Sequence, residues 1–261
     1  MINRILGVII IASFLIPAVL FAQVETEKND KRITNYYRQG QGNLKFHSTR
    51  TQLRGITNTE IRTDSIEFYN NWDKPMTLKL KDTPSHIKAK LSTDIIQPQK
   101  EGKIFITYDA RIKNDYGQCF DYLKLMTNDS IMPEKRLVIN PVIKENFSVL
   151  TPEERANAPK IVIEEKEFDF GEVKVGEKVE HDFYFRNEGK SDLIIRKTKA
   201  GCGCTATKPE KTVLKPGESS KITLIFNTAR RSGKQNKSVT VTINDPEQPT
   251  VILRMKGTII K

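Results

Sequence analysis

The chain repeats itself at a spacing of about 116 residues, and this feature constrains its fold more than any other. Matching residues recur in the same order in the two parts of the chain. The pairs at a spacing of 116 are Gly55 and Gly171, Asn71 and Asn187, Gly117 and Gly233, and Asn128-Asp129 and Asn244-Asp245. Two further pairs lie 118 apart, Lys103-Ile104 with Lys221-Ile222 and Tyr108-Asp109 with Phe226-Asn227. Such self-similarity indicates two copies of one structural unit, with a two-residue insertion or deletion between them.

Each copy has the sequence pattern of an all-β domain. In the second copy, seven short segments with alternating or β-branched residues are separated by turns rich in Gly, Pro, Asn and Asp. These segments are residues 160–163, 167–170, 179–187, 193–195, 221–226, 238–243 and 250–255, with Gly171 expected to end the second of them. Seven strands in about 100 residues are typical of an Ig-like β-sandwich. We therefore predict an all-β protein with two tandem Ig-like β-sandwich domains.

The N-terminus has the features of a signal peptide. Arg4 precedes an apolar run from Ile5 to Phe21, and Pro17 near the end of this run favours cleavage before the polar residues that follow. The alternative is an uncleaved anchor, because a span needs roughly 17–25 apolar residues. No cysteine lies near the cleavage point, so no lipid attachment is expected. We predict a periplasmic or secreted protein.

This organisation divides the chain into five parts. We expect a signal peptide over residues 1–22, a flexible segment over 23–39, a first sandwich over 40–149, a linker over 150–159 and a second sandwich over 160–261. No second apolar run is long enough to cross a membrane, so no span is expected after cleavage. The sequence does not specify an oligomeric state.

The positive charge is spread over both halves of the chain. The protein has 43 Lys and Arg against 32 Asp and Glu, a net charge of +11 that becomes +10 without residues 1–22. An exported protein seldom meets nucleic acid, so we expect no nucleic-acid partner. One local cluster stands out in a predicted hairpin loop, formed by Arg230, Arg231, Lys234 and Lys237. It is either a solvated loop tip or a contact for an anionic glycan, lipid headgroup or acidic protein.

A family resemblance lies in the second copy. The residues that carry it are Phe168–Val173, Gly176-Glu177, Phe183–Gly189, Gly201–Thr205, Leu214–Glu218 and Thr242–Pro246. The pattern resembles a large bacterial family of exported Ig-like domains of unknown function with a C-x-C motif. That family is similar to ASPM/Hydin-type Ig domains and, more distantly, to the major-sperm-protein and pilus-chaperone sandwiches. The resemblance covers residues 160–260, is weaker over 40–149, and implies a fold and a compartment but no activity.

The motif Cys202-Gly203-Cys204 allows three interpretations. Both thiols can be small apolar fillers of the domain, as free cysteines often are. They can also form a strained disulfide, because Gly203 permits the backbone bend and nearby Lys and Arg favour thiolate. The third possibility is a soft-metal site such as Cu(I), for which the scattered His47, His86 and His181 offer no further ligands. Cys119, in the other copy, is expected to be a buried structural thiol, with an intermolecular bridge as the alternative.

No motif predicts catalysis. The chain has no G-x-S-x-G, no H-E-x-x-H and no phosphate-binding glycine loop, so we expect a non-enzymatic protein without a cofactor. We expect a binding or scaffolding protein that recognises an envelope protein or a glycan. The two alternatives are a periplasmic chaperone-like protein that binds clients by β-strand addition and a thiol-redox or copper protein centred on Cys202 and Cys204.

Overall fold

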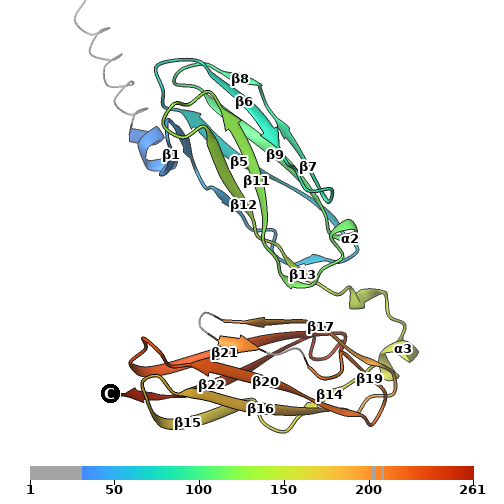
Figure 1. The fold of residues 1–261 in the computed structure, drawn as a ribbon. Coiled ribbons are helices and arrows are strands. Elements are labelled where there is room, and N and C mark those ends of the chain that lie inside the picture. The colour runs from blue at the N-terminus through green and yellow to red at the C-terminus, as the bar shows by residue number, and fades with distance from the viewer. Residues whose placement is uncertain (1–30, 202–203, 207–208) are drawn as a thin grey trace, which may run out of the picture.

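The protein consists of two β-sandwiches in tandem, as predicted. The computed structural model describes residues 31–201, 204–206 and 209–261, and Figure 1 shows both sandwiches with a short connection between them. Within the described residues, no helix is long and apolar enough to span a membrane. The predicted signal peptide and residues Cys202 and Gly203 lie outside the described residues.

The first sandwich contains thirteen strands and one short helix. Its elements are β1 (Gln39–Gln41), β2 (Leu44–Phe46), β3 (Arg50–Thr51), β4 (Ile56–Thr57), β5 (Ile61–Asn70), β6 (Met76–Lys81), β7 (Ile87–Leu91), β8 (Ile95–Ile96), β9 (Glu101–Asp109), α2 (Ala110–Lys113), β10 (Gly117–Gln118), β11 (Asp121–Thr127), β12 (Glu134–Ile139) and β13 (Val142–Lys144). The two main sheets have the strand orders β1-β2-β5-β9-β7 and β3-β12-β11-β6-β8, and β10-β13-β4 forms a small third sheet.

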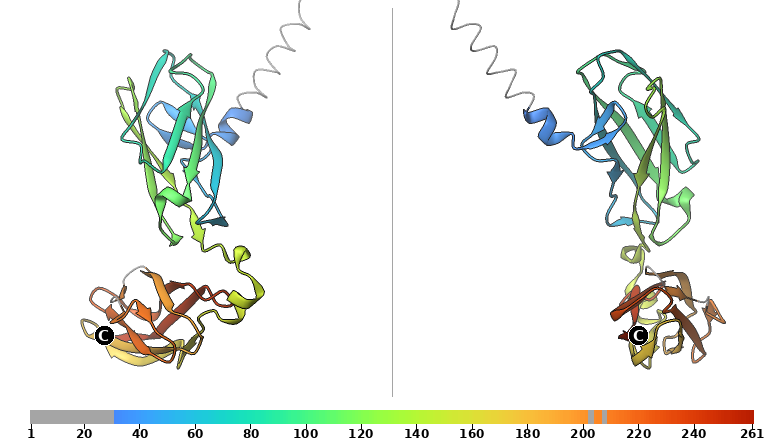
Figure 2. Two further views of the ribbon diagram at one scale, coloured as in Figure 1. Left: turned by 90° about the vertical axis from the view of Figure 1, so that its right-hand side faces the viewer. Right: turned by 60° about the vertical axis from the view of Figure 1, so that its left-hand side comes forward.

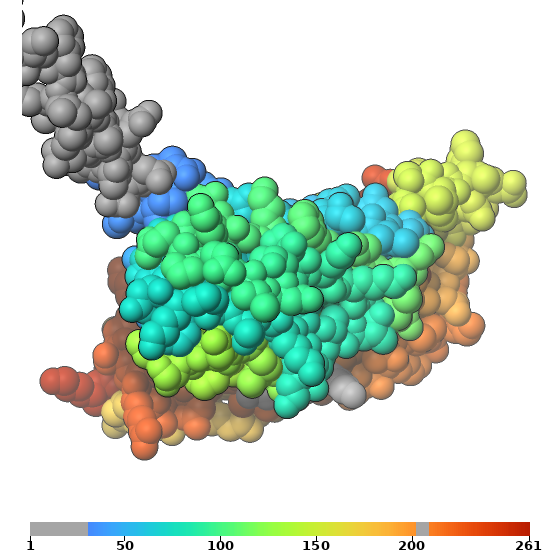
Figure 3. Space-filling model, turned by 90° about the horizontal axis from the view of Figure 1, so that it is seen from above, coloured from blue at the N-terminus to red at the C-terminus, as the bar shows by residue number. Residues whose placement is uncertain are grey.

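The second sandwich follows a connection that contains η1 (Phe147–Val149) and α3 (Pro152–Ala156), visible beside the domains in Figure 2. Its described strands are β14 (Ile161–Ile163), β15 (Glu167–Lys174), β16 (Lys178–Asn187), β17 (Leu193–Ala200), β18 (Cys204–Ala206), β19 (Val213–Leu214), β20 (Ser219–Asn227), β21 (Gly233–Ile243) and β22 (Thr250–Ile260). They form the sheets β14-β16-β20-β18 and β15-β22-β21-β17-β19. The first sandwich lies over the second when the molecule is viewed from above (Figure 3).

The two sandwiches have equivalent strand orders. The order β2-β5-β9-β7 in the first corresponds to β14-β16-β20-β18 in the second, and β3-β12-β11-β6-β8 corresponds to β15-β22-β21-β17-β19. The shared alternation explains this: Ile104, Ile106 and Tyr108 on β9 are buried, and so are Ile222, Leu224 and Phe226 at the positions 118 residues later. Burying a large apolar side chain stabilises a fold by about 1.5–3 kcal/mol, so the same pattern selects the same inward face twice.

The repeated glycines hold left-handed turns. Gly55 and Gly171 have φ angles of 66° and 65°, a region that only glycine enters readily. The expectation that Gly171 ends its strand is wrong, because β15 continues to Lys174 through a change of register between Asp169 and Glu172. The corresponding Gly55 separates the two short strands β3 and β4, so one bulge position appears in both sandwiches.

A buried asparagine closes the end of one strand in each sandwich. Asn187 Nδ2 donates to the carbonyl oxygens of Ser191 and Leu214 at 2.8 and 2.9 Å. The residue with this role in the first sandwich is Asn70, not the predicted Asn71; its Nδ2 donates to Lys74 O and Ile96 O at 2.9 and 3.2 Å. The spacing between equivalent residues is therefore 116 at Gly55, 117 at Asn70 and 118 at Ile104, so the two-residue difference arises in two single-residue steps.

The repeated Asn-Asp pair has the same hydrogen bonds in both copies. Asn128 Oδ1 accepts from Thr77 N at 2.9 Å, and Asn244 Oδ1 accepts from Ile194 N at 2.6 Å. The neighbouring aspartates accept a backbone N–H from the opposite sheet, Asp129 from Asn43, directly before β2, and Asp245 from Ile161, on β14. Buried polar groups need such partners, which explains why these residue types recur in a diverged repeat.

Of the segment expected to be flexible over 23–39, the structure describes residues 31–39. Residues 31–36 are helical, and Ile33 and Tyr37 are buried together with Tyr69. The Tyr37 and Tyr69 rings stack with their centroids 5.7 Å apart. This helix therefore covers part of the outer face of β5. In the expected linker, α3 begins with a capping box between Thr151 and Glu154.

The first sandwich contains a fully buried ion pair that has no counterpart among the described residues of the second. Lys135 Nζ lies 2.5 Å from Asp129 Oδ2, and both side chains have 0% exposure. Asp129 also accepts the Asn43 and Ile131 N–H groups at 2.7 and 3.0 Å. In the second sandwich the position equivalent to Lys135 is Val251, and Asp245 is satisfied by backbone N–H groups. In the part of the chain that the structure describes, a buried cation is found in the first sandwich alone.

Replacing Lys135 with Met should lower the free energy of unfolding of the first sandwich by about 3–5 kcal/mol, because Asp129 would remain buried without its cation. Trp72, the single tryptophan, packs against this core, so its fluorescence during urea unfolding reports on this sandwich. Lys79→Met, an exposed lysine of the same sheet, is the matched control and should change stability by less than about 0.5 kcal/mol. Equal effects of the two substitutions would contradict this role of the ion pair.

Acid should remove part of this stability. Burial alone would raise the pKa of Asp129, but hydrogen bonds from Lys135, Asn43 and Ile131 outweigh it and lower the pKa to about 2. An unfolded aspartate titrates near pH ~3.9, so the contribution is complete above that pH and is lost as the pH falls toward 2. The difference in unfolding free energy between the wild type and Asp129→Asn should therefore shrink between about pH 5 and pH 2. The unfolding free energies are measured by Trp72 fluorescence. A difference between the two proteins that stays constant from pH 5 to pH 2 would refute the contribution of the ionised Asp129.

Candidate functional site

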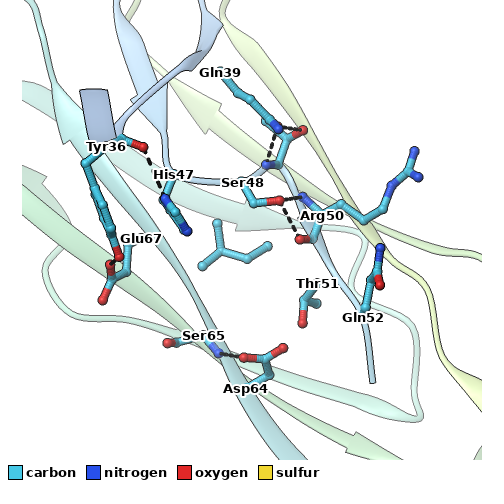
Figure 4. Close-up of a pocket in the computed structure, with 12 residues that line it drawn as sticks. Tyr36, Gln39, His47, Ser48, Arg50, Thr51, Gln52, Asp64, Ser65 and Glu67 are labelled. Atoms are coloured by element: carbon cyan, nitrogen blue, oxygen red, sulfur yellow. Dashed lines mark hydrogen bonds between the residues drawn. The ribbon is translucent and has the colours of Figure 1, made fainter. Parts of the chain in front are cut away.

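A polar cavity of about 670 Å³ opens on the first sandwich between the helix of residues 31–36, the segment that joins β2 to β3, and β5. Figure 4 shows its walls, with Tyr36 and Glu67 on one side, Arg50, Thr51 and Gln52 on the other, and Asp64 and Ser65 below. The lining comes from three separate stretches of the chain: Tyr36 and Gln39, His47 to Gln52, and Asp64 to Glu67.

One wall of the cavity is a stacked pair of rings. The Tyr36 and His47 rings lie 4.0 Å apart between centroids, with 13° between their planes. His47 Nδ1 lies 3.1 Å from the Tyr36 carbonyl oxygen, which can only accept a hydrogen bond. Nδ1 therefore carries the proton, and in the neutral ring Nε2 is left as an acceptor. The pair offers both apolar ring surface and a hydrogen-bonding atom.

Glu67 adds a charged group beside these rings. Its carboxylate accepts a hydrogen bond from the Tyr36 hydroxyl at 2.5 Å and forms an ion pair with Lys103 at 2.7 Å. The hydrogen bonds from Lys103 and Tyr36 lower the pKa of Glu67, and the Glu67 carboxylate raises the pKa of Tyr36. At neutral pH the wall thus holds an ionised carboxylate whose charge is balanced by Lys103.

The β2–β3 segment is held in shape by its own polar side chains. Ser48 Oγ donates to Arg50 O at 2.7 Å and accepts from Arg50 N at 3.1 Å. Gln39 Oε1 accepts from the Thr49 N–H and from its hydroxyl, both at 2.7 Å. These bonds orient the segment, so the cavity is formed before any ligand enters.

Thr51 is the unusual residue of the lining. Its side chain is 5% exposed, and its hydroxyl has no hydrogen-bond partner among the described residues. A buried hydroxyl without a partner costs about 1–3 kcal/mol, so native proteins rarely leave one unsatisfied. The hydroxyl is itself covered by protein, so it is not a contact that a ligand in the cavity can reach.

The lining combines donors and acceptors with little net charge. Arg50 and the Gln52 amide donate, Asp64 and His47 Nε2 accept, and the Ile66 side chain adds apolar surface. Such a lining is poorly suited to a strongly charged ligand. It suits a compact molecule that both donates and accepts hydrogen bonds and has one apolar face.

Sequence reasoning missed this cavity. Among its lining residues only His47 had drawn attention, as one of three scattered histidines. The available signal was the uninterrupted polar run from His47 to Gln52, where an alternating pattern would have placed apolar residues. The other histidines pack locally: His181 stacks on Phe168 at 3.8 Å and lies 2.6 Å from Glu165, and His86 lies 3.1 Å from Asp121.

The cysteine motif cannot be placed as a site. Cys202 lies outside the described residues, and of Cys204 the structure describes only its place in β18. The filler, disulfide and metal interpretations therefore remain predictions. Among the described residues, no group of three or more His, Cys, Asp or Glu side chains is arranged to hold a metal ion.

Cys119 lies buried where the two sandwiches meet. It is a free cysteine with 3% exposure, and its thiol donates to Asp115 Oδ2 at 3.2 Å. Lys197 of the second sandwich places its ammonium 3.6 Å from the sulfur and 2.8 Å from Asp115 Oδ2. Burial, together with the hydrogen bond to Asp115, raises the pKa of Cys119 to about 11. The expectation of a buried structural thiol fits this environment.

Further contacts from β17 extend this interface. Arg196 forms a two-point ion pair with Glu145, at 3.0 and 2.6 Å. Lys199 donates to Gln118 Oε1 at 2.7 Å and lies 4.3 Å from the Phe120 ring centroid. The basic residues that the sequence suggested as thiolate neighbours of Cys202 and Cys204 are therefore engaged, in part, with the first sandwich.

The predicted basic cluster is divided between a turn and a strand. Arg230 and Arg231 lie in the turn after β20, whereas Lys234 and Lys237 lie on β21. The segment is not the expected hairpin, because β20 and β21 belong to different sheets. Lys237 places its ammonium 5.1 Å from the Phe226 ring centroid. The structure therefore does not gather the four side chains in one loop.

The comparisons with known proteins show a fold without an assigned function. Residues 161–259 match the family model described as "Protein of unknown function (DUF1573)". A crystal structure of a protein of unknown function from Porphyromonas gingivalis W83 is similar with a TM-score of 0.64 and 16% identity, covering 83% of this chain and 100% of that one. No curated protein matches the chain.

Two weaker likenesses involve Ig-like domains. An ASH/PapD-like domain of human CEP192 has a TM-score of 0.33 and 16% identity, covering 43% of this chain and 94% of that one. The periplasmic chaperone SfaE has a TM-score of 0.31 and 13% identity, covering 83% of this chain and 100% of that one. Neither bears on what this protein binds.

The buried position of Cys119 predicts slow chemical modification. In a Cys202→Ser, Cys204→Ser background, Cys119 should react with iodoacetamide at pH 8 about a hundredfold more slowly than an ordinary thiol, since its raised pKa leaves little thiolate. The control is the same background with Cys119→Ser and a new cysteine at the exposed Ser130. Mass spectrometry over time gives both rates, and similar rates would show that the thiol is accessible.

Proposed function

We propose that this protein is an exported, non-catalytic binding module of the bacterial cell envelope, and that the cavity beside Thr51 holds a hydroxyl-rich ligand, namely a saccharide unit of a glycan. The signal-peptide pattern of residues 1–22 supports the exported location. The cavity that the stacked rings of Tyr36 and His47 share with the Asp64 carboxylate is the observation that carries the binding site.

The lining matches the chemistry of a sugar ring. A pyranose has hydroxyl groups that both donate and accept, and its C–H groups form an apolar face. The Asp64 carboxylate can accept from the hydroxyls, whereas the rings of Tyr36 and His47 offer surface for the apolar face. A volume of about 670 Å³ accommodates one or two sugar units.

The polar side chains of the cavity support binding rather than bond cleavage. Ser48, Gln39 and Glu67 each have hydrogen bonds that fix the walls. These walls can orient a ligand. None of these three side chains is arranged as a nucleophile beside a general base. The two-sandwich body then acts as the scaffold that presents the site.

Substituting Asp64 with Asn should weaken ligand binding about fivefold or more while leaving the fold intact, because it removes the charge of an acceptor that lines the cavity but keeps the side-chain shape. Binding is first detected on an array of defined neutral and acidic oligosaccharides and then quantified by calorimetry with the best oligosaccharide. Asp73→Asn, an exposed aspartate outside the cavity, is the matched control and should bind normally.

A second variant separates loss of binding from loss of structure. Tyr36→Ala removes one ring of the stacked wall, and it should weaken binding without changing the urea unfolding midpoint reported by Trp72. If the protein binds none of the oligosaccharides, or if Asp64→Asn and Asp73→Asn bind equally, the cavity is not a saccharide site.

A further inference from the structure

The first sandwich has a groove where neighbouring strands of its two sheets leave their edges open. The groove has a volume of about 610 Å³ and runs between β6 and β7. Its lining residues include Leu80, Ala89 and Leu91, and none of its lining residues belongs to the cavity beside Thr51. It is therefore a separate surface from the proposed saccharide site.

The edge of β6 is open over its second half. Its outer neighbour β8 pairs only with Met76 and Thr77. Leu78 N donates to Asp94 O at 2.8 Å, on the side away from β11. Since strand backbones alternate with a period of two, the N–H and C=O of Leu80 point to that same side. Among the described strands none pairs with Leu80 there.

The edge of β7 is open beyond Ile87, whose N–H donates to Pro84 O, because β7 is the last strand of its sheet. His86 O accepts from Asp109 N, and Ser92 N donates to Lys103 O, both at 2.9 Å. These bonds show that the backbone N–H and C=O groups of the even-numbered residues of β7 point toward β9. The backbone groups of Ala89 and Leu91 therefore point outward, toward the groove.

The floor of the groove is apolar and continuous with the core. Leu80, Ala89 and Leu91 are half-buried and pack against the core of the first sandwich. An extended peptide could therefore bury every second side chain on this floor and form main-chain hydrogen bonds with the open edges. These are the two requirements for β-strand addition.

The rim of the groove is basic. Lys79, Lys81, Lys88 and Lys90 alternate along the two strands, are exposed, and form no ion pair within the described residues. Asp94 is the one acidic residue in the groove lining. Lysines on an open edge discourage pairing with another basic or neutral strand. They also disfavour a second copy of this chain, because four lysines would meet four lysines.

We propose that this groove binds an extended acidic segment of a partner protein by strand addition. The segment alternates apolar residues, which contact Leu80, Ala89 and Leu91, with Asp or Glu residues, which face the lysines of the rim. The open backbone groups of Leu80 and Ala89 supply the main-chain hydrogen bonds. The four lysines select the acidic segment and increase its rate of association.

The test uses two fluorescein-labelled seven-residue peptides that alternate Val or Ile with either Glu or Lys. Fluorescence anisotropy should show binding of the acidic peptide, with at least about tenfold weaker binding of the basic one. Amide hydrogen exchange of the full chain, with saturating acidic peptide, should slow at Leu80, Ala89 and Leu91. Exchange that slows only at other strands would place the peptide elsewhere and overturn the proposal.

Two charge-reversal variants locate the acidic contact. Lys79→Glu with Lys90→Glu should weaken binding of the acidic peptide at least about tenfold. Arg231→Glu with Lys234→Glu makes the same change in net charge on the second sandwich and should leave binding unchanged. A loss in the second variant instead would assign the anionic contact to the basic residues after β20 and refute the groove.

A backbone variant tests the strand-addition geometry. Ala89→Pro removes an N–H that points away from β9, so the ladder inside the sheet is retained. This variant should weaken peptide binding about fivefold or more, with an unchanged unfolding midpoint reported by Trp72. Unchanged affinity, or no binding of the acidic peptide to the wild type, would exclude strand addition at this edge.

Discussion

Both sandwiches depend on one buried carboxamide at the end of a central strand. Asn70 and Asn187 each tie the end of that strand to the turn that follows and to a short strand of the opposite sheet. The two sheets of a sandwich are otherwise joined by apolar packing, which has no direction. The carboxamide adds direction, and it sets where the chain leaves one sheet and enters the other.

The sequence was sufficient to predict the two all-β units and most strands of the second, because alternation selects an inward face directly. It was not sufficient at positions that depend on neighbours distant in the chain. Gly171 has the sequence signature of a strand end, yet the pairing of β15 with β22 continues past it. Lys135 lies in an alternating strand and resembles a surface lysine, but Asp129 draws it into the interior. The cavity was unpredictable for the same reason, since Tyr36, Thr51 and Asp64 meet only in three dimensions.

The family match and the proposed binding features lie in different halves of the molecule. The matched residues 161–259 form the second sandwich, whereas the cavity and the groove belong to the first. In the second sandwich, part of the outer face formed by β17 and β21 is covered by the first. The two copies therefore share one fold but differ in their exposed surfaces, and both proposed binding features lie on the first.

The contact between the sandwiches has a mechanical consequence. Arg196, Lys197 and Lys199 all extend from one strand, and they meet Glu145, Asp115 and Gln118 of the first sandwich. Such partly exposed charge pairs are screened by dissolved ions, whereas the apolar cores are not. The joint should therefore loosen with rising ionic strength while both bodies stay rigid. The first sandwich then behaves as a lever, and a small rotation at β17 moves the far end of that domain by the largest distance.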